Sequence, residues 1–265
     1  MYMDLELAGD SALVTASSSG LGKASATALA REGADVVING RDKERLEAAK
    51  DEISDVASGT VVTQQGDLTE KDDIEALVET ATSEFGGLDH LVTSAGGPPS
   101  GAFLETTDED WYHAFDLLVM SVVRLVREAE PALQEGDGGT ITNITSRSVK
   151  EALDSLVLSN SVRMSVIGLE KTLSRELAPE IRVNAVLPGS HETSRIENLV
   201  EAAVERGEFD SYEDSMEARG ESIPIGRIGD PMELGDTIAY LCSDRAGNIN
   251  GQAIVIDGGS GNANL

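Results

Sequence analysis

The chain has 265 residues, of which 40% are hydrophobic, and its 48 acidic and 20 basic residues give a formal net charge of −28. This length suits one α/β domain with a sizeable core, and the hydrophobic content excludes a disordered chain. The negative charge opposes binding to nucleic acids, and no apolar run is long enough to span a bilayer. We therefore expect neither a nucleic-acid partner nor a membrane partner.

The excess of acids over bases is typical of a protein that stays soluble in strong electrolyte. We interpret it as halophilic adaptation to a salt-rich cytoplasm; the alternative, an acidic protein from low-salt surroundings, fits the scarcity of lysine less well. The segment Met1–Asp10 is acidic rather than apolar, so no signal peptide is predicted. Cys242 is the single cysteine, which rules out an internal disulfide, and its helical surroundings indicate packing.

Apolar runs that suit buried strands alternate with segments of helical periodicity. Strands are predicted at Leu13–Val14, Asp35–Ile38, Val61 to about Gly66, Leu88–Thr93, Ile141–Ile144, Ile181–Leu187 and Ala253–Ile256. Helices are predicted at Lys23–Glu32, Leu46–Val56, Ile74–Ala81, Trp111–Val126, Ser155–Pro179, Ile238–Cys242 and, as a flap over the substrate end, within residues 190–225. This alternation predicts a single domain, residues 1–265, with a parallel sheet of about seven strands covered by helices on both faces.

The turn between the first strand and the first helix, in the run LVTASSSGLGK from Leu13 to Lys23, is built from small residues. Small side chains let a phosphate group approach the backbone, and the helix start offers unpaired N–H groups and the positive end of its dipole. The pattern therefore predicts a dinucleotide site. The alternative is an ordinary turn in which the serines cap the helix. Because ligands bind beyond the carboxyl ends of parallel strands, the loops that follow the strands should meet at one crevice.

Further landmarks follow the other strands: Asp67-Leu68, Ala95-Gly96, Asn143-Ile144-Thr145-Ser146, Asn184 to Gly189, and Val255 to Gly259. With the glycine-rich turn, their order resembles the short-chain dehydrogenase/reductase family over nearly the whole chain, in particular its 3-oxoacyl-carrier-protein-reductase-like branch. The resemblance implies a Rossmann-type doubly wound fold, a nicotinamide cofactor, hydride transfer between a small-molecule carbonyl and an alcohol, and a homotetramer. It places the cofactor against loop residues, namely Ala16, Ser18, Ser19, Gly20, Leu21, Gly22, Asn39, Arg41, Asp67, Leu68, Ser94, Ala95, Gly96, Ile144, Pro188 and Gly189.

The cofactor site departs from the family pattern in two loops. Ala16 stands where the family has its leading glycine, and Thr93-Ser94 replaces the usual Asn-Asn. The position that usually supplies an acid for the ribose hydroxyls is Gly40, and Arg41 follows it. A guanidinium suits a 2′-phosphate through bidentate hydrogen bonds, so we predict NADP(H) in preference to NAD(H). The alternative is that Arg41 is a solvated charge ahead of a helix.

The catalytic positions depart further from the family pattern of Ser, Tyr and Lys with an Asn on the preceding helix. Ser146 matches the serine, whereas the tyrosine, lysine and asparagine positions hold Ser159, Arg163 and Leu118. A phenol near a cation can protonate an alkoxide, but an aliphatic alcohol is a far weaker acid, and a guanidinium does not release its proton usefully. Ser159 and Arg163 lie four residues apart on one helix face, so both should face the crevice. We assign catalytic roles to Ser146, Ser159 and Arg163.

Two other groups could donate the proton. Lys150 lies four residues after Ser146, and His191 follows Pro188-Gly189 with an imidazole that titrates near neutral pH. The alternatives are a solvated loop charge for Lys150 and a polar flap residue for His191. Asp67 is interpreted as an adenine contact rather than a catalytic acid. The three histidines are scattered without ligand spacing, so no metal site is predicted.

Three functions remain open at the level of sequence. The first is an NADP(H)-dependent oxidoreductase with an altered proton donor, which we favour because Ser146 and the nicotinamide-side loop are present. The second is a dinucleotide-binding protein that has lost its chemistry and acts as a sensor or partner. The third is a structural subunit, which the intact loops disfavour. Arg147, Lys150 and Arg163 near the mouth indicate an anionic substrate group, although the acidic flap would repel one.

The net charge predicts that stability depends on salt. Mutual repulsion among the carboxylates is screened as ionic strength rises, so the melting temperature should increase by several degrees between about 0.1 M and about 2 M KCl. Circular dichroism during a thermal scan measures this. A melting temperature that stays constant over that range would refute the salt adaptation.

Overall fold

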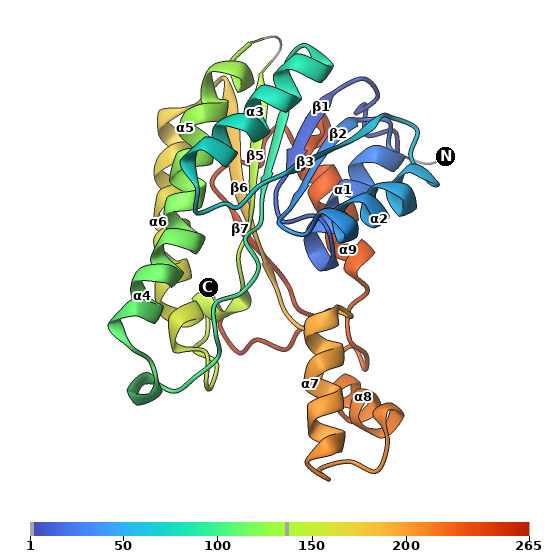
Figure 1. The fold of residues 1–265 in the computed structure, drawn as a ribbon, viewed down its shortest axis with the longest axis vertical. Coiled ribbons are helices and arrows are strands. Elements are labelled where there is room, and N and C mark those ends of the chain that lie inside the picture. The colour runs from blue at the N-terminus through green and yellow to red at the C-terminus, as the bar shows by residue number, and fades with distance from the viewer. Residues whose placement is uncertain (1–2, 136–137, 265) are drawn as a thin grey trace.

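The computed structural model describes residues 3–135 and 138–264, which form one seven-stranded parallel sheet in the order β3-β2-β1-β4-β5-β6-β7. The strands are β1 (Ser11–Val14), β2 (Asp35–Gly40), β3 (Val61–Gln65), β4 (His90–Thr93), β5 (Gly139–Ile144), β6 (Ile181–Pro188) and β7 (Ala253–Ile256). Helices flank both faces of this sheet (Figure 1). The predicted doubly wound architecture is therefore confirmed.

The helices are α1 (Gly20–Arg31), α2 (Lys43–Ser54), α3 (Lys71–Phe85), α4 (Asp108–Phe115), α5 (Ser121–Leu133), α6 (Val157–Glu176), α7 (Ser194–Glu205), α8 (Tyr212–Glu221) and α9 (Pro231–Cys242). Two buried apolar clusters join them to the sheet. One holds side chains of α1, α2 and α9, and the other holds side chains of α3, α5 and α6. No helix within residues 3–135 and 138–264 combines the length and the apolar character needed to cross a membrane.

The strand order reverses next to β1, which fixes the position of a ligand crevice. Leu13 of β1 pairs with Val37 of β2 on one side and with Leu91 of β4 on the other. The loops after β1 and β4 therefore leave the sheet toward opposite faces and open a crevice at the carboxyl ends of the strands. Helices α7 and α8, within the predicted flap segment, project beyond the body of the sheet (Figure 1).

Most helix boundaries differ by several residues from the sequence-based expectation: α2, α3 and α9 begin three to seven residues earlier than predicted, and three other differences have a specific structural reason. Helix α1 begins at Gly20, three residues before the predicted start, because its first turn is formed by the small-residue loop itself. Helix α6 covers less than the predicted Ser155–Pro179, since Ser155 has a left-handed φ of 57° that no helix accepts. The apolar stripe at Trp111–Val126 is interrupted by a π-helical turn over Asp116–Met120, which separates α4 from α5. One added residue rotates the following side chains by about 100°, and the apolar stripe here is broad enough to stay continuous through that rotation, so periodicity does not reveal the break.

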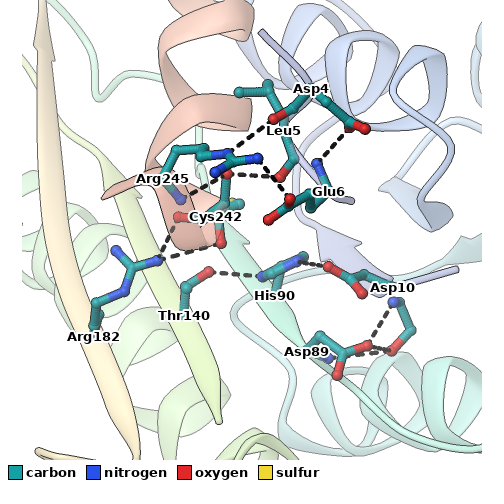
Figure 2. A network of polar contacts seen from close by, with 12 residues as sticks. Asp4, Leu5, Glu6, Asp10, Asp89, His90, Thr140, Arg182, Cys242 and Arg245 are labelled. Atoms are coloured by element: carbon teal, nitrogen blue, oxygen red, sulfur yellow. Dashed lines mark hydrogen bonds and ion pairs between the residues drawn. The ribbon is translucent and has the colours of Figure 1, made fainter. Parts of the chain in front are cut away.

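The amino ends of the strands, opposite the crevice, are joined by polar contacts (Figure 2). His90 at the start of β4 bridges Asp10 at 3.0 Å and Thr140 at 2.9 Å through its two ring nitrogens. Arg182 at the start of β6 donates to carbonyl oxygens at the end of α9, among them that of Cys242 at 3.3 Å. Burial raises the pKa of the Cys242 thiol to about 11, which agrees with its predicted packing role.

Glu170 of α6 is a buried acid that the sequence analysis did not single out. Its side chain is 1% exposed, and one carboxylate oxygen has no hydrogen-bond partner in the part of the chain that the structure describes. Burial raises the pKa of this carboxyl to about 7, and the neighbouring charge of Lys171 offsets only part of that shift. The folded protein therefore holds a proton on Glu170 that the unfolded chain loses near its ordinary pKa of 4.5.

Replacing Glu170 should stabilise the protein in a pH-dependent way. Because the pKa is raised in the folded state, stability falls as pH rises from about 4.5 to about 7 and stays lower above that range. Glu170→Gln should therefore raise the free energy of unfolding at pH 8 by about 1–3 kcal/mol and much less at pH 5. Denaturant titration at both pH values measures this, with Glu176→Gln, an exposed acid of the same helix, as the control. An equal effect of Glu170→Gln at both pH values would contradict the assignment.

Candidate active site

A cavity of about 790 Å³ opens at the carboxyl ends of the strands. It extends from Arg41 after β2 to Arg163 of α6 and includes residues of α7 and α8. Every cofactor-contact and catalytic residue predicted from the sequence lines this one cavity, namely Ala16, Ser18, Ser19, Gly20, Leu21, Gly22, Asn39, Arg41, Asp67, Leu68, Ser94, Ala95, Gly96, Ile144, Ser146, Ser159, Arg163, Pro188 and Gly189. The topology therefore brings the predicted residues together, while their individual roles stay predictions.

The turn after β1 has a left-handed backbone at Ala16 and allows only glycine at position 22. Ala16 has a left-handed φ of 46°, which explains why a glycine is usual there and which costs an alanine roughly 1–2 kcal/mol. The amide of Ala16 donates to the Asn39 side chain at 3.2 Å. A side chain at Gly22 would clash with the carbonyl oxygen of Ala16, so only glycine lets the helix start this close to the strand.

The serines of this turn do not cap helix α1. Ser19 occupies the N-cap position, yet its side chain makes no capping hydrogen bond. The Ser17 hydroxyl turns inward and donates to the carbonyl oxygen of Val14 at 2.6 Å. The N–H groups of the first helical turn, which have no partner within a helix, thus begin at the wall of the cavity. This arrangement favours an anion site over an ordinary capped turn.

At the far end of the cavity, the loop after β2 brings Gly40 and Arg41 beside Asp67. A Cβ atom at Gly40 would lie 2.9 Å from the Ser18 side chain, so the close approach of these two loops leaves no room for the acid usual at this position. The Arg41 side chain is 76% exposed, and its Nη1 lies 3.7 Å from Asp67 Oδ2. Burial acts to raise the pKa of Asp67, but hydrogen bonds from Thr69 and the charge of Arg41 outweigh it and lower the pKa.

Three serine hydroxyls lie where β5 and α6 meet. The Ser146 hydroxyl accepts a hydrogen bond from the Ser148 amide at 3.1 Å and caps the short 3₁₀ turn Arg147–Val149. The hydroxyls of Ser148 and Ser159 are both buried and lie 3.0 Å apart. Sequence reasoning missed Ser148; its place two residues after Ser146 in a tight turn was the available signal. The Ser159 hydroxyl therefore has the Ser148 hydroxyl as its hydrogen-bond partner.

Arg163 faces the cavity from the same side of α6 as Ser159, as predicted from their spacing. Its side chain is largely buried, and Nη2 donates a hydrogen bond to the carbonyl oxygen of Gly96 in the loop after β4. Leu118 of the π-helical turn lines a separate void of about 10 Å³ next to Arg163, room for about one water molecule. The asparagine position of the family thus presents an apolar side chain that offers no hydrogen bond.

The two alternative proton donors differ in position. Lys150 is exposed and does not line the cavity, so the structure overturns its candidacy and leaves it a solvated loop charge. His191 lines the cavity and is 4% exposed, with Nδ1 3.3 Å from the carbonyl oxygen of Gly189. Burial lowers the pKa of His191 despite that hydrogen bond, so its imidazole is neutral at neutral pH and a weak acid. Across the described part of the chain, no cluster of His, Cys, Asp and Glu side chains could hold a metal ion.

The flap contributes cavity residues that sequence reasoning missed. Thr193, Ser194 and Ile196 line the cavity from the start of α7, and Arg219 lines it from α8. The Thr193 side chain lies 3.5 Å from the place of a Cβ on Gly20, so the base of the flap contacts the first turn. These residues follow Pro188-Gly189 without a recognisable motif, and only the folding of the chain back over the strand ends brings them to the cavity.

Known proteins of similar sequence cover nearly the whole chain. A family model described as Enoyl-(Acyl carrier protein) reductase matches residues 15–261. The uncharacterized oxidoreductase YvrD of Bacillus subtilis is 32% identical over 261 residues, covering 97% of this chain and 98% of that protein. The 3-oxoacyl-acyl-carrier-protein reductase FabG of Thermotoga maritima is 32% identical over 256 residues, covering 96% and 99%.

Solved structures match the fold equally well. The L-sorbose reductase of Gluconobacter frateurii, in complex with NADPH and L-sorbose, superimposes with a TM-score of 0.92 at 32% identity, covering 97% of this chain and 98% of that one. An actinorhodin polyketide ketoreductase variant with NADPH gives a TM-score of 0.87 at 32% identity, covering 96% and 97%. The strand order, the glycine-bearing turn at the switch point and these matches together show that the chain belongs to the short-chain dehydrogenase/reductase family of oxidoreductases, on the FabG-like branch.

Proposed function

We propose that this protein is an NADP(H)-dependent oxidoreductase that interconverts a carbonyl group and an alcohol in a small molecule. The observation that carries the proposal is one continuous cavity, lined at one end by the turn after β1 and Arg41 and at the other by Ser146, Ser159 and Arg163. Relatives on the same branch include FabG proteins and structures complexed with NADPH, which supports the same class of reaction.

The residues present fit a dinucleotide with a 2′-phosphate. The uncapped start of α1 suits the pyrophosphate, because its first N–H groups and the helix dipole favour an anion. The crowding of Gly40 against Ser18 excludes a carboxylate at the ribose, and the exposed Arg41 guanidinium is free to turn from Asp67 toward a phosphate. These features support NADP(H) over NAD(H).

The chemistry at the other end follows from the three polar side chains. When bound, the nicotinamide ring supplies or accepts the hydride. The hydroxyls of Ser146 and Ser159 donate hydrogen bonds to the substrate oxygen, and the fixed charge of Arg163 stabilises negative charge that develops there. The Ser148 hydroxyl, 3.0 Å from that of Ser159, orients the Ser159 hydroxyl, and the proton that converts the alkoxide to the alcohol is supplied by water that enters the cavity. Stabilisation of the oxyanion thus replaces much of the work that a tyrosine would do by direct proton transfer.

A second function, dinucleotide binding without turnover, is supported by the loss of the tyrosine, lysine and asparagine side chains. The described residues that line the cavity include no tyrosine or lysine, and the neutral His191 is a weak acid. We favour the first function over this one because Ser146 and the Ser148–Ser159 pair still offer hydrogen-bond donors to an oxyanion. A structural subunit that binds nothing is disfavoured by the size of the cavity.

Reversing the charge of Arg41 should change the choice of cofactor. Arg41→Asp should weaken NADPH binding by about 10–100-fold and leave NADH within a few-fold, because one charge-assisted hydrogen-bond pair to the 2′-phosphate is lost. Fluorescence titration of each reduced cofactor measures both affinities. Arg45→Asp is the control, since it makes the same charge change at an exposed residue that does not line the cavity. An unchanged ratio of NADPH to NADH affinity in Arg41→Asp would refute the NADP assignment.

Removing the Ser146 hydroxyl should slow turnover without removing the cofactor. Ser146→Ala should lower kcat by about 10–1000-fold on any ketone that the wild type reduces, with NADPH affinity unchanged, because a donor to the oxyanion is lost. NADPH oxidation in high KCl, followed at its absorbance band, measures kcat. The double variant Ser159→Tyr/Arg163→Lys supplies the family's proton donor and should raise kcat. Saturable NADPH binding with no oxidation on a broad carbonyl panel, in either protein, would instead establish the binding-only function.

A further inference from the structure

The cavity lining has more basic than acidic side chains, whereas the chain as a whole has more acidic than basic ones. Acids outnumber bases by 48 to 20 overall, yet arginines predominate among the charged cavity residues. Arg41 and Asp67 offset each other at the adenosine end. Arg147, Arg163 and Arg219 line the cavity near the catalytic serines, and Asp154 is the one carboxylate among the described lining residues there. Arg163 is engaged with the Gly96 carbonyl, and Arg219 interacts electrostatically with Glu208, which lies outside the lining, so Arg147 is the arginine to consider for a substrate anion. An excess of guanidinium groups at the substrate end marks the preferred charge of the ligand.

From this balance we propose that the substrate is a small oxo acid whose carboxylate is bound by Arg147, beside the catalytic serines. The proposal rests on the oxidoreductase function above and specifies its substrate class.

Arg147 is placed to reach a substrate that contacts Ser146, because it is the next residue and begins the 3₁₀ turn that Ser146 caps. Its side chain is 22% exposed and lines the cavity. The nearest acid, Glu151, lies 3.8 Å away, beyond hydrogen-bond distance, and does not line the cavity. The Glu151 carboxylate instead accepts two hydrogen bonds from Asn262. The backbone amide of Asn262 lies 3.2 Å from Oε2, and its side-chain Nδ2 lies 3.0 Å from Oε1. The guanidinium of Arg147 therefore keeps most of its capacity to bind an anion.

The surroundings suit a carboxylate that is attached to a carbon chain. A guanidinium binds a carboxylate through two parallel hydrogen bonds, and such charge-assisted bonds are about twice as strong as neutral ones. Leu117, Leu153 and Leu156 also line the cavity and give a short carbon chain an apolar surface. A neutral ester of the same shape makes the same apolar contacts but loses the charge. Comparing an acid with its ester therefore isolates the contribution of Arg147.

The test uses acetoacetate and methyl acetoacetate, which share the ketone and differ in the charge of the acid group. Calorimetric titration of each into the wild-type protein, with and without saturating NADP+, the oxidised cofactor that cannot reduce a ketone, is run at the lowest KCl concentration that keeps the protein folded. Low salt is required because chloride screens the guanidinium. Acetoacetate should bind at least about tenfold more tightly than the ester. Equal binding of the two compounds would overturn the proposal.

Variants then assign the effect to one side chain. Arg147→Gln should weaken acetoacetate binding by at least about tenfold and leave the ester within about twofold, and Arg147→Lys should restore part of the loss because it keeps the charge but not the fork. Arg206→Gln, which removes a flap arginine that pairs with Glu208 outside the cavity, controls for net charge and should change neither ligand. Equal weakening of acid and ester by Arg147→Gln, or no weakening of either, would refute the carboxylate contact.

The design separates this inference from the function on which it rests. NADPH affinity of Arg147→Gln should match the wild type, so a loss confined to acetoacetate identifies a substrate contact and not a cofactor contact. If wild-type protein failed to bind NADPH, the proposed function would fail, whereas the acid-to-ester ratio without cofactor would still report on Arg147. If NADPH bound normally and the ratio were one, the oxo-acid class alone would be excluded.

Discussion

The close approach of two backbone segments, at Ala16 and Gly22, is the constraint from which the site follows. No side chain fits at position 22 against the Ala16 carbonyl, and Ala16 itself holds a left-handed backbone. With that turn closed, α1 starts directly beyond β1, at the point where the strand order reverses. The first helical N–H groups then reach the cavity wall, and the apolar residues of α1 pack on the sheet with those of α9. The alanine in place of the usual glycine changes the energy of this turn but not its geometry.

The net charge of the whole chain is negative, whereas the charged side chains that line the cavity are mostly arginines. The overall composition carries a large excess of acids, so the chain as a whole has a strongly negative net charge. The cavity instead gathers arginines, and these attract anions into a site whose surroundings would repel them. A phosphate-bearing cofactor and a carboxylate-bearing substrate both fit that local field. Screening by salt weakens the long-range repulsion of the exterior while leaving the short hydrogen bonds inside the cavity largely intact.

The catalytic end shows how a family site can be rebuilt with weaker acids. A tyrosine beside a lysine can transfer a proton, whereas in the proposed mechanism a serine pair beside an arginine stabilises an oxyanion. The Ser148–Ser159 hydrogen bond and the bond from Arg163 to the Gly96 carbonyl tie α6 to the loops after β5 and β4. The replacement therefore affects the loops around the site as well as the reacting groups. Slow turnover, or a substrate that needs little acid catalysis, is consistent with such a site.

The sequence by itself determined the seven strands, the site at their carboxyl ends and the loop residues after the strands that line it, because burial period and turn chemistry are local properties. It placed Ser146, Ser159 and Arg163 in one crevice, since helical spacing and strand ends fix their directions. It did not reveal the π-helical break before Ser121, because the apolar stripe is broad enough to hide the rotation that one extra residue causes. The tertiary structure alone decided that Ser159 pairs with Ser148, that Lys150 faces solvent, and that Arg219 of the flap reaches the cavity. These outcomes depend on how distant segments pack against one another, which no local pattern encodes.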